Sequence, residues 1–257
     1  RGMDFQCDTV GACAFNSYSY SKKSTSLTAS QKEEWNNFVE RFKKYKFSNT
    51  KKYNRQEICS ILKIPENKQI IFCPLQMPRD QLLLFQTSWC HSMVEYLYAC
   101  CCLFDNKDKF YIIFKQHPAF KLYSNDPFLL WTVSRFKEEN AIFLEATHEI
   151  NTASLILNSD ATVTVNSSTG MEALTLDKPV ISLGYNAWTP VTIHWNDIKQ
   201  KHNYDEAIKK FNQQDIREKR ISFLYNLMFK HTVLFKENLD FNEILEFSNK
   251  KLVYHQL

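Results

Sequence analysis

Short apolar segments rich in β-branched and aromatic residues recur through the middle of the chain. The five segments are residues 69–74, 110–114, 141–144, 161–165 and 179–183. Each is nearly continuous in apolar character and is followed by turn residues, as in strands buried on both faces of a parallel sheet. Helical stretches lie between them at residues 88–103, 128–137 and 150–157. The alternation predicts a doubly wound α/β domain, in which ligands bind beyond the carboxyl ends of the strands.

A helical pattern precedes this core. Apolar residues from Trp35 to Phe42 recur at helical spacing. Ser30 and Glu33 have the spacing of a capping box. We therefore expect a helix that begins at Ser30 and ends near Tyr45.

The remaining flanks are less regular. Residues 1–30 show no clean period and are expected to form loops or strand remnants, and a short helix is expected at residues 57–62. From residue 204 onwards the chain is expected to be mainly helical, with apolar residues at helical spacing in residues 223–229 and 241–247. Such aromatic stripes are typical of a packed core, and a docking surface for a partner is the alternative.

Composition excludes several classes of protein. With 257 residues, 44% hydrophobic and 23% charged, the chain can bury one sizeable core, with or without an appendage, and is not globally disordered. The formal net charge is only +4 and the basic residues are scattered, so a nucleic-acid-binding surface is not indicated. Mild basicity suits an anionic ligand or an anionic lipid surface.

The eight cysteines do not have the spacing of a metal site. Cys100, Cys101 and Cys102 are consecutive, and no paired C-x-x-C motif occurs. We expect free cysteines packed as small hydrophobes in a reducing cytosol. No apolar run approaches the ~20 residues of a membrane span and no signal peptide opens the chain, which predicts a cytoplasmic location. Because the sequence begins at Arg1 rather than Met, it is expected to be a piece of a longer protein.

Two polar runs follow two of the predicted strands. The first is Lys115-Gln116-His117-Pro118, and the second extends from Asn166 to Leu174. The second run contains, in order, Asn166, Ser167, Ser168, Thr169, Gly170 and Glu172. A hydroxyl-rich turn that opens a helix directs N–H groups, hydroxyls and the helix N-terminus at an anion. Lys115 and His117 could complete this phosphate site, so a nucleotide-linked substrate is expected.

The first predicted strand contributes two further candidates at the same edge of the sheet. These are Gln76 and Asp80, and Asp80 is the nearby carboxylate available for chemistry. The alternative for Asp80 is the N-cap of a helix at residues 81–85, because Asp is favoured at that position.

Each residue of the polar runs also has a structural alternative. His117 could be a turn histidine held by a backbone carbonyl, and Lys115 could be an edge-strand charge facing water. Residues 167–169 could form a turn that satisfies its own backbone. Glu172 could sit in a first helical turn to suit the helix dipole. A binding site is favoured because all these groups converge on one edge of one sheet.

The combination of motifs resembles a known family. The motifs are Gln76-x-x-x-Asp80, Lys115-x-His117-Pro118, Asn166 to Leu174, Lys178-Pro179-Val180 and Leu183-Gly184. In this order they resemble the bacterial capsule polysaccharide biosynthesis proteins, which include β-Kdo transferases that use CMP-Kdo as donor. Residues 27–54 are also similar to the segment that joins the two halves of those enzymes. The resemblance covers roughly residues 25 to 190.

The resemblance implies a GT-B fold, which has two Rossmann-like domains and binds the donor nucleotide in the C-terminal one. Residues 1–60 would be the remnant of an N-terminal acceptor domain plus a linker helix. Residues 61–200 would form the donor domain, and residues 201–257 a helical extension packed on it. Because so little chain precedes the linker, a missing N-terminal domain or a larger polypeptide is expected.

The resemblance also implies roles for single residues. His117, Ser167 and Ser168 would hold the CMP phosphate with Lys115 nearby, and Glu172 would reach the ribose or cytosine. Further donor-binding candidates are Pro118, Asn166, Thr169 and Gly170. The catalytic candidates are Asp80, as the carboxylate, and Gln76.

The chemistry implied is metal-independent and without a cofactor. A carboxylate can stabilise or attack the oxocarbenium-like centre that forms when the phosphate departs. Retention of configuration through a covalent adduct on Asp80 and retention by front-face attack both remain open. The partners implied are a nucleotide-sugar donor and a glycan or glycolipid acceptor, with no nucleic acid. Peripheral attachment to the inner face of the membrane is left open.

Two alternative functions keep the same fold. In the first, the donor is CMP-sialic acid or a UDP- or GDP-sugar. In the second, the chain is a catalytically silent module of a capsule assembly complex that docks through its aromatic C-terminal helices.

Overall fold

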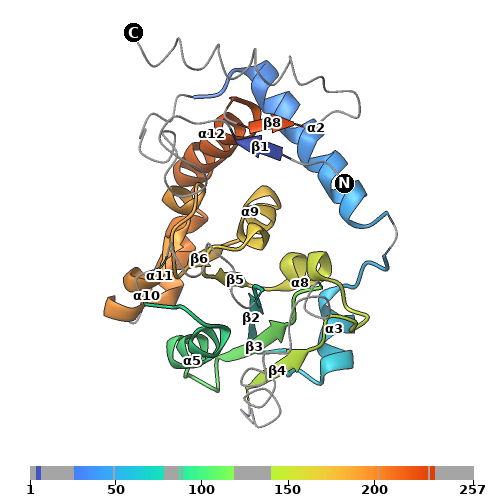
Figure 1. The fold of residues 1–257 in the computed structure, drawn as a ribbon, viewed down its shortest axis with the longest axis vertical. Coiled ribbons are helices and arrows are strands. Elements are labelled where there is room, and N and C mark those ends of the chain that lie inside the picture. Colours follow the sequence, from blue (N-terminus) through green and yellow to red (C-terminus); the bar gives the residue numbers. More distant parts are fainter. Residues whose placement is uncertain are drawn as a thin grey trace. The chain divides into compact units, whose positions relative to one another are not determined.

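A computed structural model describes residues 4–6, 26–48, 50–77, 87, 89–118, 140–201, 203–230 and 232–234. The chain divides into two compact units, and each is described by itself. One unit consists of residues 37–185 and 192–211, and the other of residues 1–36, 186–191 and 212–257 (Figure 1).

The larger unit is built on a six-stranded parallel sheet. Its strands are β2 (Gln69–Pro74), β3 (Phe110–Lys115), β4 (Ala141–Leu144), β5 (Ala161–Thr164), β6 (Val180–Ser182) and β7 (Ile193–His194). Their order is β4-β3-β2-β5-β6-β7, and every pair is parallel. The chain therefore adds β3 and β4 on one side of β2 and then returns to add β5, β6 and β7 on the other. This is the doubly wound order, and it confirms the predicted fold class.

The five predicted strands all form, with bounds that differ by at most one residue at either end. They form because their residues are apolar almost without interruption, and the strands at the centre of the sheet are buried on both faces. The sixth strand, β7, was not predicted. It contains only two residues, Ile193 and His194, so no period-2 pattern can be detected there.

Among the described residues, six helices belong wholly to this unit. They are α3 (Arg55–Leu62), α5 (Met93–Leu103), α8 (Thr152–Asn158), α9 (Ser168–Thr175), α10 (Trp195–Lys201) and α11 (Tyr204–Phe211). Four of them begin at side-chain caps, which are Asn54, Ser92, Asn151 and Ser167. Each cap accepts a hydrogen bond from a backbone N–H that the first helical turn leaves unpaired. The expected helix at residues 88–103 therefore begins only at Met93.

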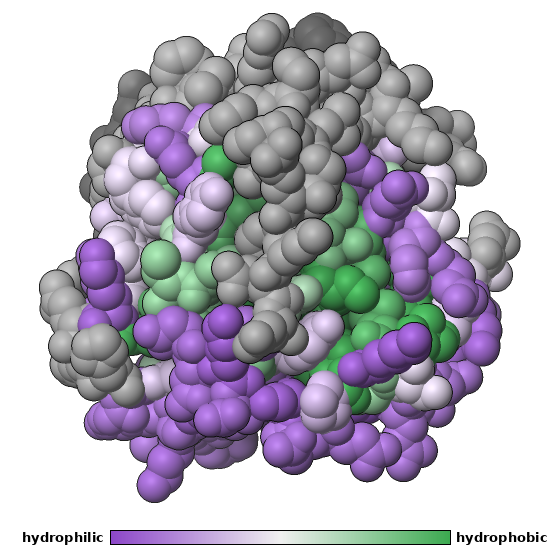
Figure 2. Space-filling view, turned by 90° about the horizontal axis from the view of Figure 1, so that it is seen from below, coloured by the Kyte–Doolittle hydropathy of each residue, from purple (hydrophilic) through white to green (hydrophobic). Residues whose placement is uncertain are grey.

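Helices cover both faces of the sheet. Figure 1 shows α5 and α10 on one side and α3, α8 and α9 on the other. Tyr96 of α5 packs edge-on against Phe114 of β3 and donates its hydroxyl to the carbonyl of Val163 at 2.7 Å. The Tyr96 hydroxyl is thus paired inside an otherwise apolar part of the core. Figure 2 shows one face of the molecule, on which hydrophobic residues gather towards the middle and hydrophilic residues lie around them.

The segment that precedes α3 is bound to α8 by its backbone. Asn151 donates to the carbonyl of Lys51 at 2.6 Å, and Asn158 donates to the carbonyl of Tyr53 at 2.9 Å. The N–H of Tyr53 donates to the hydroxyl of Ser154 at 3.1 Å. These bonds fix the entry of the chain into the sheet.

The second unit contains α12 (Gln214–Lys230) and a two-stranded antiparallel sheet of β1 (Asp4–Gln6) and β8 (Thr232–Leu234). It also contains the one-turn 3₁₀ helix η2 (Thr189–Val191). The expectation of a mainly helical C-terminal part is confirmed for α11 and α12 and is wrong at β8. Residues 128–137 and 241–247, where helices were expected, lie outside the described residues.

Helix α2 (Ala29–Lys46) contributes residues to both units. The predicted helix is confirmed, but its cap is wrong. Thr28 and Gln31, rather than Ser30 and Glu33, exchange the two hydrogen bonds of the capping box. Thr28 and Gln31 have the same spacing as Ser30 and Glu33, and sequence spacing alone cannot rank the two pairs. The predicted domain boundaries at residues 60 and 200 stay predictions.

Candidate functional site

The candidate site lies where the order of the strands reverses, between β2 and β5. Ligands of doubly wound sheets bind outside the carboxyl ends of the strands at this point. Phe72 of β2 pairs with both Ile113 of β3 and Thr162 of β5. Four residues beyond each of these, the same register brings Gln76, His117 and Asn166 to one level of the sheet edge.

The distance between the two polar runs follows from this topology. Only β2 separates β3 from β5, so the strands that lead to His117 and Ser167 are about 10 Å apart. A phosphate that is contacted by a side chain from each of these two strand ends can fill a gap of this width. The predicted convergence of the runs on one edge is therefore found in the sheet.

Gln76 and Asn166 join across the reversal point. The Gln76 side chain donates from Nε2 to Oδ1 of Asn166 at 2.8 Å and accepts from the backbone N–H of Asn166 at 3.1 Å. Gln76 is 3% exposed and Asn166 is fully buried. The backbone N–H of Gln76 also donates to the sulfur of Met93, at the start of α5. These two residues therefore form the floor of the site.

Ser167 is the N-cap of α9. Its hydroxyl oxygen accepts from the backbone N–H of Thr169 at 3.3 Å, and its own N–H donates to the hydroxyl of Thr164 at 3.1 Å. Ser168 is exposed, Thr169 is half-buried and Gly170 is buried. The turn does satisfy part of its own backbone, as one sequence alternative proposed, and it also opens a helix at the edge where an anion could bind.

Lys115 is the last residue of β3 and is 4% exposed. Its ammonium donates to the carbonyls of Glu145 and His148, both at 3.3 Å. Burial lowers the pKa of Lys115 to about 8. The alternative of an edge-strand charge is wrong, because β3 lies between β2 and β4 and the side chain points into the connection between β4 and α8.

His117 and Pro118 follow β3 at the edge of the sheet. His117 is half-buried and Pro118 is exposed. Between them and β3, Gln116 continues the ladder by donating its backbone N–H to Leu144 at 2.9 Å. Its side chain accepts from the N–H of Ala146 at 3.2 Å. The run is thereby held to the connection that Lys115 also contacts.

Glu172 is the fifth residue of α9 and forms an ion pair with Lys46 at the end of α2, with 2.6 Å between Nζ and Oε1. Both side chains are 25% exposed. The alternative of a first-turn carboxylate is wrong, because the helix begins at Ser168 and no acidic residue lies in its first turn. The implied contact with ribose or cytosine stays a prediction.

Asp80 and the helix expected at residues 81–85 lie outside the described residues. The catalytic role of Asp80 therefore stays a prediction. The remaining candidates lie at one edge of the sheet, in the part of the chain that the structure describes.

Sequence reasoning missed the partners of these residues. Lys46 could have been noticed because it belongs to the basic last turn of α2, yet nothing in the sequence connects it to Glu172. The carbonyls of Glu145 and His148 carry no sequence signal, because every residue has a carbonyl. The pKa of His148, whose carbonyl accepts from Lys115, is lowered by burial and, to a smaller extent, by the charge of Lys115.

The arrangement can bind an anion and stabilise a leaving phosphate. It offers a capped helix N-terminus, hydroxyls that can be reoriented and an imidazole at the carboxyl edge of the sheet. The buried ammonium of Lys115 lies two residues before His117, at the end of β3. No group of three or more His, Cys, Asp and Glu side chains with the arrangement of a metal site occurs among the described residues. Within the same residues, no helix has the length and apolar character needed to cross a membrane.

Comparison with known proteins identifies the family. A family model described as capsule polysaccharide biosynthesis protein matches residues 13–227. The chain belongs to this family.

A curated relative and two solved structures extend the comparison. Protein FixF of Sinorhizobium fredii is 27% identical over 162 residues, which are 61% of this chain and 37% of FixF. The KpsC β-Kdo 2,7 transferase of Thermosulfurimonas dismutans has a TM-score of 0.54 at 16% identity, over 91% of this chain and 65% of that one. The KpsC β-Kdo 2,4 transferase of the same organism has a TM-score of 0.50 at 13% identity, over 86% and 64%.

These similarities confirm the resemblance and the GT-B-like α/β fold. They also give the extent of the match: the chain spans little more than a third of FixF and just under two thirds of each KpsC structure. At this identity the two structures establish the fold alone.

Proposed function

We propose that the chain is the donor-binding part of a glycosyltransferase that moves Kdo from CMP-Kdo to a glycan or glycolipid acceptor. Family membership supports a role in capsule polysaccharide synthesis. The observation that carries the proposal is the placement of His117, Asn166 and Ser167 at one edge, where the strand order reverses. A nucleotide phosphate would bind at this edge.

The CMP phosphate would be held by the start of α9 and by His117. Ser167 and Ser168 supply hydroxyls there, and the helix N-terminus supplies partial positive charge. Lys115 adds a full positive charge behind the strand ends. Cationic and N–H groups of this kind can stabilise the departing CMP, so the proposed reaction uses no divalent ion and no cofactor.

Asp80 is proposed as the catalytic carboxylate. In a double displacement, its oxygen would bond to the anomeric carbon while the bond to the CMP phosphate breaks. The oxygen of an acceptor hydroxyl would then bond to the anomeric carbon while the bond from that carbon to Asp80 breaks, and the hydroxyl proton would pass to solvent. Front-face attack, in which Asp80 only stabilises the positive charge, gives the same retained configuration.

Gln76 is proposed to act on the reaction through other residues. The Gln76 side chain is hydrogen-bonded to the side chain and the backbone N–H of Asn166. Gln76 would therefore position the turn that leads to Ser167 rather than contact the sugar. The reaction is assigned to the cytoplasm, with attachment to the inner face of the membrane left open. The acceptor is expected to need parts of the protein beyond this chain.

Nucleotide binding tests the donor assignment. CMP should raise the melting temperature, because a ligand that binds only the folded state stabilises it. His117→Ala should abolish this shift, whereas His91→Ala, an exposed histidine ahead of α5, should leave it intact. UDP, GDP and CMP-sialic acid in the same assay rank the alternative donors. The absence of a shift with CMP and CMP-Kdo at millimolar concentration would contradict the proposal.

Turnover tests Asp80. Asp80→Asn should abolish transfer or hydrolysis of CMP-Kdo while leaving the CMP shift in place, since the nucleotide does not need the carboxylate. Asp197→Asn, an exposed carboxylate on α10, is the control. Full turnover in Asp80→Asn would remove Asp80 from the mechanism, and loss of turnover would exclude a silent module.

A matched pair of variants separates two roles of Glu172. Glu172→Gln and Lys46→Gln both break the ion pair, which at this exposure contributes at most about 1 kcal/mol to stability. If Glu172 contacts the nucleoside, only Glu172→Gln should weaken CMP binding. Equal effects of both variants on CMP binding would show that Glu172 acts only through its ion pair with Lys46 and does not contact the nucleoside.

A further inference from the structure

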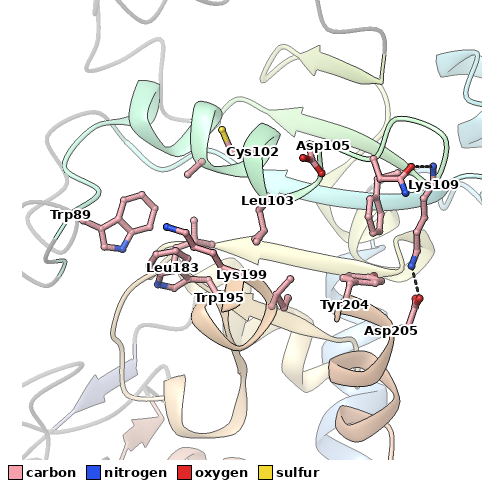
Figure 3. A pocket seen from close by; sticks show the side chains of 14 residues that line it. Trp89, Cys102, Leu103, Asp105, Lys109, Leu183, Trp195, Lys199, Tyr204 and Asp205 are labelled. Carbon is pink, nitrogen blue, oxygen red and sulfur yellow. Dashed lines mark hydrogen bonds and ion pairs between the residues drawn. The ribbon is translucent and has the colours of Figure 1, made fainter. Parts of the chain in front are cut away.

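A second hollow lies on the sheet unit. It is a cavity of about 440 Å³ beside α5, α10 and α11, and all its lining residues belong to the larger unit (Figure 3). It shares no residue with the candidate donor site. Its volume lies within the range of small-ligand sites, and its walls combine apolar and polar groups.

One end of the cavity is aromatic. Trp89 and Trp195 lie with ring centroids 5.0 Å apart and planes tilted by 48°. The ammonium of Lys199 lies over the Trp195 ring, 5.0 Å from its centroid. Figure 3 shows these three side chains together at one end of the cavity.

The other end is polar. Lys109 and Asp205 form an ion pair at 2.5 Å, and the backbone N–H of Lys109 donates to the Asn106 side chain at 3.2 Å. The carboxylate of Asp105 lies between the two ends in Figure 3 and is exposed. Tyr204 also lines the cavity, and its buried hydroxyl has no hydrogen-bond partner within the described part of the chain.

The geometry of the tryptophan pair restricts the ligand. Rings 5.0 Å apart already touch, so no nucleobase fits between them. An acyl chain would need apolar walls throughout, whereas Lys, Asp and Asn side chains line this cavity. The pair instead presents one continuous aromatic surface.

We propose that this cavity binds a saccharide that carries a carboxylate, as a site additional to the donor site. The negative faces of Trp89 and Trp195 attract the polarised C–H face of a sugar ring. Asp105 accepts hydrogen bonds from its hydroxyls. The ammonium of Lys199 pairs with the carboxylate of the sugar. The fitting class of ligand is an acidic oligosaccharide, such as a segment of a polysaccharide chain.

Binding of defined oligosaccharides to the full chain tests this inference. The probes are trigalacturonic acid, which is acidic, and maltotriose, which is neutral, both measured by calorimetry. Trigalacturonic acid should bind. Maltotriose should bind at least about threefold more weakly, because it has no carboxylate to pair with the ammonium of Lys199. Equal binding of the two sugars, or no binding of trigalacturonic acid, would overturn the proposal.

Variants locate the binding. Trp195→Ala should weaken trigalacturonate binding by about tenfold or more, the effect typical of losing an aromatic anchor. Tyr98→Ala, an exposed aromatic of α5 outside the cavity, should have no effect. Lys199→Gln gives a second test if Trp195→Ala does not fold, and it should reduce the affinity for trigalacturonate by about threefold to fivefold. Its control is Lys210→Gln, on the exposed face of α11, which should leave the affinity unchanged. Unchanged affinity in Lys199→Gln would refute the carboxylate contact.

A covalent footprint gives an independent readout. Cys102 lines the cavity and is exposed, so bound trigalacturonate should slow its alkylation by N-ethylmaleimide, read by peptide mass spectrometry. The half-buried neighbour Cys101 lies outside the lining and is the internal reference. If CMP shifts the melting temperature but Cys102 is not protected, the cavity proposal alone fails. If Cys102 is protected and CMP has no effect, the donor assignment fails and this inference stands.

Discussion

Gly184 shows how closely the sheet edge is packed. It follows β6, and its N–H donates to the carbonyl of Val165 at 3.0 Å. A Cβ at this position would lie 2.9 Å from methyl carbons of Thr87 and Val165 and 3.2 Å from the Val165 carbonyl oxygen. The glycine is needed because the side chains of Thr87 and Val165 and the backbone of Val165 leave no room for a Cβ.

Gly184→Ala should therefore destabilise the protein. The added methyl must displace Val165 and Thr87, and overpacking of this kind typically costs about 1–3 kcal/mol. Urea unfolding followed by circular dichroism measures the change. A variant as stable as the parent would show that the neighbouring side chains can move aside at no cost.

Lys115 gives the stability a pH dependence with a definite sign. Burial lowers the pKa of Lys115 to about 8 in the folded protein, below its ordinary value of 10.5. Between these two pH values the unfolded chain holds the proton and the folded chain has lost it. Raising the pH favours the state with fewer bound protons, which is the folded one.

Comparison with Lys115→Met isolates this effect. From pH 8 to about pH 10.5, the stability of the parent should rise relative to Lys115→Met, by at most about 1.4 kcal/mol per pH unit. Chemical denaturation at several pH values measures the difference and cancels the titration of other groups. A difference that is independent of pH would show that Lys115 keeps its ordinary pKa.

At the scale of elements, the caps of the helices position the site. Ser167 ends the turn after β5 and begins α9, so the same hydroxyl completes the helix and lies at the candidate phosphate position. Gln76 and Asn166 hold this turn from below. A defect in the cap should thus affect stability and nucleotide binding together.

Ser167→Ala should cost about 1 kcal/mol of stability, because the N–H of Thr169 loses its acceptor. Ser168→Ala, at the exposed next position, should change stability little. Thermal unfolding of both variants without ligand measures the contrast. Equal stability of the two would show that water replaces the Ser167 hydroxyl.

The elements that could be predicted from sequence are those with a strong local signal. Unbroken apolar runs such as residues 69–74 identified the central strands, and turn residues after them placed His117 and Ser167 at strand ends. The sequence could not identify β7, because two residues are too few to show an alternating pattern. It also could not show that helix α12 ends and a strand, β8, follows. The choice of Thr28 over Ser30 as a cap depends on where the first turn packs, which spacing does not encode.

The site could be predicted only in part for a related reason. Residue types and positions at strand ends are local, and they were sufficient to gather the two polar runs at one edge. Partners are not local: Lys46 lies 126 residues before Glu172, and Lys115 binds backbone carbonyls. Likewise, the cavity beside Trp89 and Trp195 exists only after α5 and α10 have packed.

At the scale of the whole molecule, the candidate donor residues that the structure describes all belong to the larger unit. Binding of CMP should therefore reduce hydrogen exchange in peptides that cover residues 110–118 and 161–175. Peptides of α12, in the other unit, should change little. Exchange measured by mass spectrometry with and without CMP tests this, and protection of α12 as large as that of β3 and β5 would place the nucleotide elsewhere.

The amide pair of Gln76 and Asn166 has a consequence for how the donor preference could change over evolution. Its hydrogen bonds are complete without any ligand, so exchanging one sugar for another gives no reason to alter it. A new preference would more easily arise in the residues around it, such as Ser168 and Pro118, which are exposed. Libraries that vary the rim and keep this pair should accordingly yield more folded proteins with altered donors than libraries that vary the pair itself.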